Sequence, residues 1–278
     1  MTLIRVTKRQ PCPVCLKKDW CSISENGEFV ICMRVQNRMQ TRNGGYMHFL
    51  DGQGPKHMEI IEAPQKLERL HLDWTVEAYE CSLRLGDVRM EQLVSKWGLS
   101  SPEPLKQLKV GWAPYARAYT FPMRDGGGTA IGIHLRYTSG EKLCMKGSKL
   151  GLFLPGKFDW DYQSRLYICE GASDTAVLID RGLRAIGRPS NVGSVDHVVD
   201  FCKSDDGLKE VVVVTDRDKP GSTAADCTER GRRALVASLR AIRCRVKCIR
   251  PPGHNDVREW APSRETLEAV TEAARWQR

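Results

Sequence analysis

Long apolar runs are missing from this sequence. None of its hydrophobic stretches approaches the roughly 20 residues that a helix needs to span a bilayer. Residues 1–11 alternate polar and basic side chains and lack the apolar segment of a signal peptide. We therefore expect a cytoplasmic protein without a membrane partner. Hydrophobic residues make up 41% and charged residues 28% of the 278, which excludes a disordered chain and indicates a globular one.

Regular cysteine spacing is missing too, although the chain has eleven cysteines. An odd number at uneven spacing argues against a disulfide scaffold. Four of the eleven fall within the first 32 residues, while others, such as Cys81, Cys144, Cys169 and Cys202, lie in apolar or helical stretches. In a reducing compartment this division predicts one metal site and a set of buried thiols that pack as small hydrophobic groups.

The chain divides into four segments, and it contains no internal repeat. Residues 1–50 are rich in cysteine and carry short strand-like runs. Residues 51–72 are polar and contain glycine and proline, which predicts a linker. Residues 73–162 begin with hydrophobic side chains at helical spacing and continue with strand-like runs.

The last segment, residues 163–278, alternates strands with helices. Apolar strand-like runs occupy residues 166–169, 183–186, 210–215 and 245–249. Helical patterns occupy residues 173–180, 195–202 and 223–242. This order predicts a mostly parallel sheet covered by helices.

A metal site is predicted near the N-terminus. Cys12-Pro-Val-Cys15 places two thiolates where both can reach one tetrahedral ion. The dipeptide Asn26-Gly27 then predicts a type I′ hairpin turn. Pairing Glu25 with Glu28 across that turn sets a register in which Cys21 lies opposite Cys32, close enough to share an ion. The sequence therefore predicts a structural zinc site made of Cys12, Cys15, Cys21 and Cys32.

Other arrangements of these residues remain open at this point. His48 could replace Cys21 as the fourth zinc ligand. Cys12 and Cys15 could instead form a redox dithiol, or all the cysteines could pack without a metal.

A second candidate site lies in the last segment. Glu170-Gly171 ends one predicted strand, and Asp216-Arg-Asp218 follows a strand that contains four valines. Ligands of open α/β sheets gather at the carboxyl ends of the strands, so these acids should converge. Oxygen-only ligands of this kind suit Mg²⁺ or Mn²⁺.

Basic residues are concentrated before this site. The formal net charge is +9, and residues 105–157 hold nine lysines and arginines against two acids. The clustering favours a nucleic-acid partner over an ordinary solvated face.

These motifs together resemble those of a known family. Glu170-Gly171-x-x-Asp174 followed by Asp216-x-Asp218 is similar to the toprim domain of bacterial DNA primases, phage primase-helicases, topoisomerases and some nucleases. Upstream, the segment around Arg124 and Arg136 and the segment Lys142-Leu-Cys-Met-Lys146 resemble the basic subdomain that precedes toprim in primases. Residues 151–157 match P-loop spacing, but Phe158 replaces the required hydroxyl residue, and we expect this segment to form the Leu-Phe strand of primases.

The resemblance implies an α+β fold. We expect a zinc ribbon at residues 1–50, a linker at 51–72, a mixed α+β basic subdomain at 73–162, and an α/β toprim domain with a mostly parallel sheet at 163–278. The chain departs from the family at Val35, which stands where the fourth ribbon cysteine would be. His254-Asn255-Asp256 also lacks the usual lysine before the later toprim acid.

The resemblance also implies an activity. A primase of phage or plasmid type would join ribonucleoside triphosphates into short RNA primers on a single-stranded DNA template, with a replicative helicase supplied in trans. Asp216 and Asp218, with Asp256, would hold Mg²⁺ or Mn²⁺, and Glu170 would be a metal ligand or a general base. Phosphates would be neutralised by basic residues of the upstream subdomain, namely Arg124, Arg136, Lys142 and Lys146.

Two other functions fit the same motifs: a toprim nuclease, and a catalytically silent accessory of a mobile element that binds single-stranded DNA. For individual residues, we expect Arg188 to lie in a surface loop and Asp174 to cap its own helix or bind metal. Five tryptophans could stack on bases, but we expect them in hydrophobic cores, namely Trp20, Trp74, Trp97, Trp112 and Trp160.

Overall fold

The computed structural model describes residues 3–41, 44–50, 73–156 and 164–277. The predicted linker at 51–72 lies outside these residues, as does Trp160. The chain forms two compact units, Met1–His71 and Leu72–Arg278. Among the described residues, no helix combines the length and the apolar character that crossing a membrane requires.

The first unit is built on one antiparallel sheet with the order β1-β2-β3-β4. Its strands are β1 (Leu3–Arg5), β2 (Ser22–Ser24), β3 (Phe29–Cys32) and β4 (Tyr46–Phe49). The pairing of Ser22 with Ile31 is the predicted hairpin register, and continuing it by one residue places Cys21 opposite Cys32. The unit has a small core of its own, in which two valines pack with buried cysteines.

The hairpin turn differs from the predicted type I′ turn. Gly27 has φ +74°, but Asn26 does not have the positive φ that this turn type requires. Instead, Gly27 N donates to the carbonyl of Ser24 at 2.8 Å, so the turn starts at Ser24. The Ser24 hydroxyl donates to the carbonyl of Phe29 and accepts from Phe29 N, each at 3.1 Å. These two hydrogen bonds close the hairpin just outside the predicted pair of Glu25 and Glu28.

The second unit begins with three helices and an antiparallel sheet. The helices are α1 (Trp74–Leu83), α2 (Gly86–Trp97) and α3 (Glu103–Gln107). The Asp73 side chain caps α1, and Gly98 ends α2 in the left-handed region with φ +64°. The sheet has the order β5-β6-β7-β8, with strands β5 (Gly111–Ala113), β6 (Ala118–Arg124), β7 (Ala130–Tyr137) and β8 (Lys142–Cys144).

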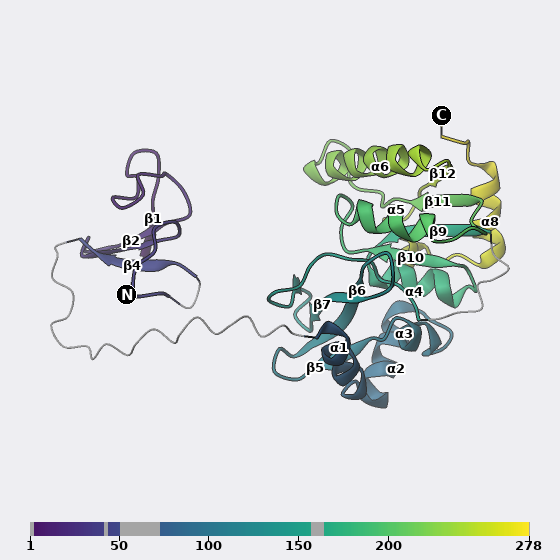
Figure 1. The fold of residues 1–278 in the computed structure, drawn as a ribbon, viewed down its shortest axis with the longest axis horizontal. Coiled ribbons are helices and arrows are strands. Elements are labelled where there is room, and N and C mark those ends of the chain that lie inside the picture. Colours follow the sequence, from purple (N-terminus) through teal and green to yellow (C-terminus); the bar gives the residue numbers. More distant parts are fainter. Residues whose placement is uncertain (1–2, 42–43, 51–72, 157–163, 278) are drawn as a thin grey trace. The chain divides into compact units, whose positions relative to one another are not determined.

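A parallel sheet follows, with the strand order β10-β9-β11-β12 (Figure 1). Its strands are β9 (Arg165–Glu170), β10 (Ala185–Arg188), β11 (Glu210–Val214) and β12 (Arg245–Ile249). Its helices are α4 (Ala172–Asp180), α5 (Val195–Lys203), α6 (Thr223–Ala241), α7 (Val257–Trp260) and α8 (Arg264–Ala273). The predicted fold class, α+β with a parallel sheet in the last segment, is confirmed.

Helices cover both faces of the parallel sheet, which is why its strands read as continuous apolar runs. Ile168 and Val213 pack into one core with residues of α5 and α6. Their chain neighbours, Cys169 and Val212, pack into a second core with α4 and α8. Both faces of the strands are therefore buried, and the polar side chains lie at the carboxyl ends of the strands.

A short segment connects the two sheets of the second unit. Leu152 exchanges backbone hydrogen bonds with Arg124 at the end of β6, at 2.7 and 2.8 Å. The next residue, Phe153, exchanges backbone hydrogen bonds with Gly187 in β10, at 2.8 and 3.0 Å. The antiparallel sheet is therefore joined to the edge of the parallel sheet next to the carboxyl end of β10.

Candidate functional site

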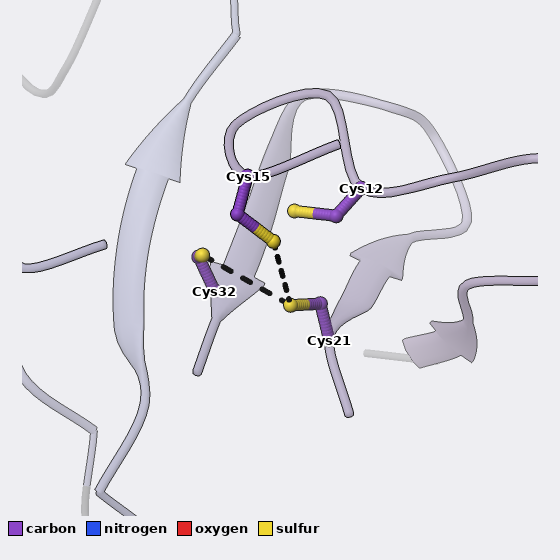
Figure 2. Close-up of side chains that lie close together, drawn as sticks. All are labelled: Cys12, Cys15, Cys21 and Cys32. Atoms are coloured by element: carbon purple, nitrogen blue, oxygen red, sulfur yellow. Dashed lines mark hydrogen bonds between the residues drawn. The ribbon is translucent and has the colours of Figure 1, made fainter. Parts of the chain in front are cut away.

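The four cysteines of the first unit form one cluster (Figure 2). Their sulfur atoms all lie within 4.8 Å of one another. Cys21 Sγ is 3.7 Å from Cys15 Sγ and 3.9 Å from Cys32 Sγ. A tetrahedral zinc ion with Zn–S bonds near 2.3 Å would separate its ligands by about 3.8 Å, so the cluster fits structural zinc.

Backbone and side-chain donors surround the cluster. Met33 N lies 3.4 Å from Cys21 Sγ, and Val35 N lies 3.3 Å from Cys32 Sγ. The guanidinium of Arg34 reaches two of the sulfurs at 3.8 and 3.9 Å. Burial raises the pKa of Cys21 to about 12, so its thiolate needs a nearby cation. The donors would offset part of the negative charge that four thiolates bring to one ion.

The alternative ligand His48 lies outside this cluster. It sits in β4 opposite Val30, and its Nε2 is 3.1 Å from the carbonyl oxygen of Val35. The structure thus brings Cys21 to the cluster and engages the His48 ring elsewhere in the unit.

The predicted acids of the second unit gather around one cleft with a volume of about 110 Å³. Glu170 enters it from the end of β9, and Asp216 enters it two residues after β11. Asp256 caps α7 by accepting a hydrogen bond from Glu259 N at 2.6 Å, and Asp174 reaches the cleft from α4. Carboxylates from four separate elements therefore meet at the carboxyl edge of the sheet.

The fifth acid, Asp218, lies beside the cleft and outside its lining residues. Its Oδ2 accepts a hydrogen bond from the Thr228 hydroxyl at 2.6 Å. Its negative charge nevertheless contributes to raising the pKa values of Glu170 and Asp216. Asp218 could serve a cation at this site with the oxygen that Thr228 does not occupy.

Burial and mutual repulsion disfavour the ionised form of these carboxylates when no cation is bound. Burial, with the charges of Glu170, Asp174 and other acids, raises the pKa of Asp216 to about 8. Burial and the charge of Asp256 raise the pKa of Asp174 to about 7. Burial likewise raises the pKa of Glu170. A divalent cation would remove this repulsion, and oxygen ligands are the type that Mg²⁺ and Mn²⁺ bind.

Two of the four predicted basic residues line the cleft, namely Arg136 and Lys142. Arg136 lies over the Trp97 ring, with its Cζ 5.6 Å from the ring centroid. Arg124 instead donates to the carbonyl of Gly128 at 2.9 Å, and the exposed Lys146 lies outside the lining.

Two further cleft residues, Arg258 and His134, are absent from the sequence prediction. Arg258 pairs with Asp256 at 3.2 Å. Burial and the charges of Lys142 and Arg136 lower the pKa of His134 to about 4, so its ring is neutral near pH 7. Strand alternation could have revealed His134, because it lies two residues from Arg136 and so on the same face of β7.

Three expectations about single residues need correction. Arg188 is 5% exposed and donates to loop carbonyls, because it ends a buried strand. Asp174 is 2% exposed, and its Oδ2 accepts from Val257 N at the start of α7 at 3.3 Å, so it does not cap its own helix, while its place in the cleft leaves metal binding open. Trp20 is 67% exposed, because the small first unit has a core too narrow for it, whereas Trp97 and Trp112 are buried as expected.

The fold of this chain is similar to that of primase catalytic cores. No protein-family model matches the chain, and no curated protein matches it by sequence. Three solved structures illustrate the likeness.

The Escherichia coli primase catalytic core is 19% identical, with a TM-score of 0.56 over 73% of this chain and 79% of that chain. A DnaG primase catalytic domain bound to single-stranded DNA is also 19% identical, with a TM-score of 0.56 over 73% and 78%. The zinc-binding and RNA polymerase domains of Aquifex aeolicus primase are 14% identical, with a TM-score of 0.56 over 100% and 81%. At these identities the likeness establishes the fold.

Proposed function

We propose that this protein is a DNA primase that makes short RNA primers on single-stranded DNA. The observation that carries the proposal is the cleft, where one buried and three half-buried carboxylates meet Arg136 and Lys142 at the carboxyl edge of the sheet. Anionic and cationic side chains in one cleft suit a substrate that carries both phosphates and divalent cations. The fold of primase cores and the four-cysteine cluster support the same function.

The chemistry would be nucleotidyl transfer, in which a ribose 3′-hydroxyl attacks the α-phosphate of a nucleotide and pyrophosphate leaves. Asp216, Asp218 and Asp256 would hold Mg²⁺ or Mn²⁺, which stabilises charge on the attacking and leaving oxygens. Arg136 and Lys142 would bind phosphate oxygens of the nucleotide or the template. The raised pKa of Glu170 makes its carboxylate a better proton acceptor for the attacking hydroxyl.

The first unit would add a second contact to the template. Tethering two DNA-binding units raises the effective concentration of each at the other's site. The exposed Trp20 ring offers this unit a surface on which a base can stack.

The test is incubation with single-stranded DNA, labelled ribonucleoside triphosphates and Mg²⁺ or Mn²⁺. We expect short RNA ladders from the wild-type protein and none from Asp216→Asn. Shortened DNA without ribonucleotide incorporation would identify a nuclease. DNA binding without either product would identify a silent accessory. The nuclease result and the accessory result would each reject the proposal.

A further inference from the structure

The loop after β10, residues 189–193, is held in place by a buried arginine. Arg188 donates from Nε to the carbonyl of Gly193 at 3.0 Å, and from Nη2 to the carbonyl of Asn191. The Ser190 hydroxyl also accepts from Gly193 N at 3.0 Å. A guanidinium that is 5% exposed needs these acceptors, because an unpaired buried charge is costly. The path of the loop is therefore fixed.

The side chain at the centre of this loop begins a chain of hydrogen bonds that ends on an acid. Asn191 Nδ2 donates to Thr228 Oγ1 at 2.7 Å. Thr228 Oγ1 in turn donates to Asp218 Oδ2 at 2.6 Å. Thr228 is 3% exposed, so water does not compete freely for its hydroxyl. We call these three residues the Asp218 hydrogen-bond chain.

Close packing of α6 against the same loop supports this chain. A Cβ atom at Gly231 would lie 2.0 Å from the carbonyl oxygen of Asn191 and 2.7 Å from its carbonyl carbon. Only glycine lets the helix approach so closely. Thr228 lies three residues earlier on α6 and thus on the same face of the helix. Asn191 is fixed through its backbone by Arg188 and Gly231, and through its side chain by Thr228.

We propose that Thr228 and Asn191 are positioning residues that orient the Asp218 carboxylate, to which the proposed function assigns a divalent cation. Thr228 donates one hydrogen bond to Oδ2, which fixes the orientation of the Asp218 carboxylate and keeps Oδ1 available to the cation. Residues that hydrogen bond to ligating carboxylates set their orientation in this way. The inference rests on the proposed function only in assigning a cation to these acids.

Direct measurement of Mn²⁺ binding to the whole protein tests the inference without DNA or nucleotides. Thr228→Val removes the hydroxyl at nearly constant shape, and we expect the Kd for Mn²⁺ to rise about 10- to 100-fold by titration calorimetry. Thr228→Ser should restore wild-type affinity. Asn191→Ala should raise the Kd less, and it carries the test if Thr228→Val does not fold.

Two controls separate positioning from general damage. Thr271→Val removes another fully buried helical hydroxyl, which donates to Leu267 O at 2.8 Å on α8, and should leave Mn²⁺ affinity unchanged. In an Asp218→Asn background, Thr228→Val should cause no further loss, because the two residues act through the same ligand.

Wild-type Mn²⁺ affinity in Thr228→Val, or an equal loss in the Asp218→Asn background, would overturn the inference. So would a wild-type protein that binds no Mn²⁺. If Thr228 and Asp218 are coupled in their effect on Mn²⁺ affinity but no primers are made, the proposed function fails and the inference stands. If primers are made and Thr228→Val binds Mn²⁺ normally, only the inference fails.

Discussion

The two clusters of ligand side chains in this protein are assembled in opposite ways. The cysteines lie between positions 12 and 32, on one turn and one hairpin. The acids lie between positions 170 and 256, on elements that come together only when the parallel sheet forms. A local cluster can be specified by spacing, whereas a distributed cluster depends on the order of the strands and the packing of both faces.

The clusters also differ in what a metal ion would do for them. The sulfur cluster belongs to a unit with a core of five buried residues, so we expect the fold of this unit to depend on the ion. The acids stand on a sheet that packs into two large hydrophobic cores, so we expect this sheet to fold without an ion. The first metal would therefore be needed for folding, and the second for chemistry.

The largest expected effect comes from removing zinc. Structural zinc contributes apparent binding energies of about 10–16 kcal/mol in small modules, so chelation should unfold the first unit and leave the second folded. Circular dichroism and proteolysis would follow the two units separately. Cys21→Ser should lose the zinc, while His48→Ala, as the control, should keep about one ion per chain. Zinc retained by Cys21→Ser and lost by His48→Ala would contradict the assignment of ligands.

The next largest effect is on catalysis. Asp216→Asn removes a charge from the proposed cation site at nearly constant shape. Primer synthesis should fall by about 10³-fold or more, since a bound cation supplies several kcal/mol of transition-state stabilisation. The melting temperature should not fall, because a buried charge among like charges is removed. Near-wild-type synthesis would show that the acids are ordinary loop residues.

A third effect concerns the pH dependence of stability without divalent cations. The pKa of Asp216 is raised to about 8 and that of Asp174 to about 7, so the folded state binds more protons than the unfolded state above pH 4. The stabilisation from these groups is complete below about pH 4 and is lost as pH rises through the raised pKa values. Between pH 5 and 8 the free energy of unfolding should fall by about 4–7 kcal/mol, the lower value being the contribution of Asp216 alone.

Asp216→Asn should flatten this dependence, and Mg²⁺ should reduce it in the wild-type protein. Urea unfolding at several pH values measures both changes. An increase in stability over this range would mean that the acids are paired in the folded state.

The smallest effect concerns DNA binding. The slope of log affinity for single-stranded DNA against log salt should become shallower by about 0.7 in Lys142→Ala, the change expected for one lost phosphate contact. Lys146→Ala is the matched control, because Lys146 is exposed but lies outside the cleft. Equal changes in both variants would place the DNA contact on the whole basic surface and not in the cleft.

The elements that sequence reasoning predicted share one property: their signals are local. Buried strands such as Glu210–Val214 were recognisable because both faces are covered and the four residues after Glu210 are all valines. The cysteine register followed from counting outward along one hairpin, and it held although the turn type was wrong, because Ser24 and Phe29 close the hairpin themselves.

What the sequence did not reveal depends on packing between distant segments. Arg188 looked like a loop residue, but it is buried because β10 extends to it and two loop carbonyls accept hydrogen bonds from its guanidinium. Asp218 stands two residues from Asp216 on the same loop, yet it turns to Thr228 on α6. No spacing rule along the chain predicts such a choice of partner.

The segment that joins the two sheets has a mechanical consequence. Leu152 is hydrogen bonded to β6 and Phe153 to β10. The two sheets can therefore move apart only if these backbone hydrogen bonds break. Gly187 also admits no side chain, since a Cβ there would lie 2.0 Å from Thr175 Oγ1. The acidic and basic walls of the cleft are thereby coupled as one stiff frame. Under the proposed function, a change in the width of the cleft would require these backbone hydrogen bonds to break.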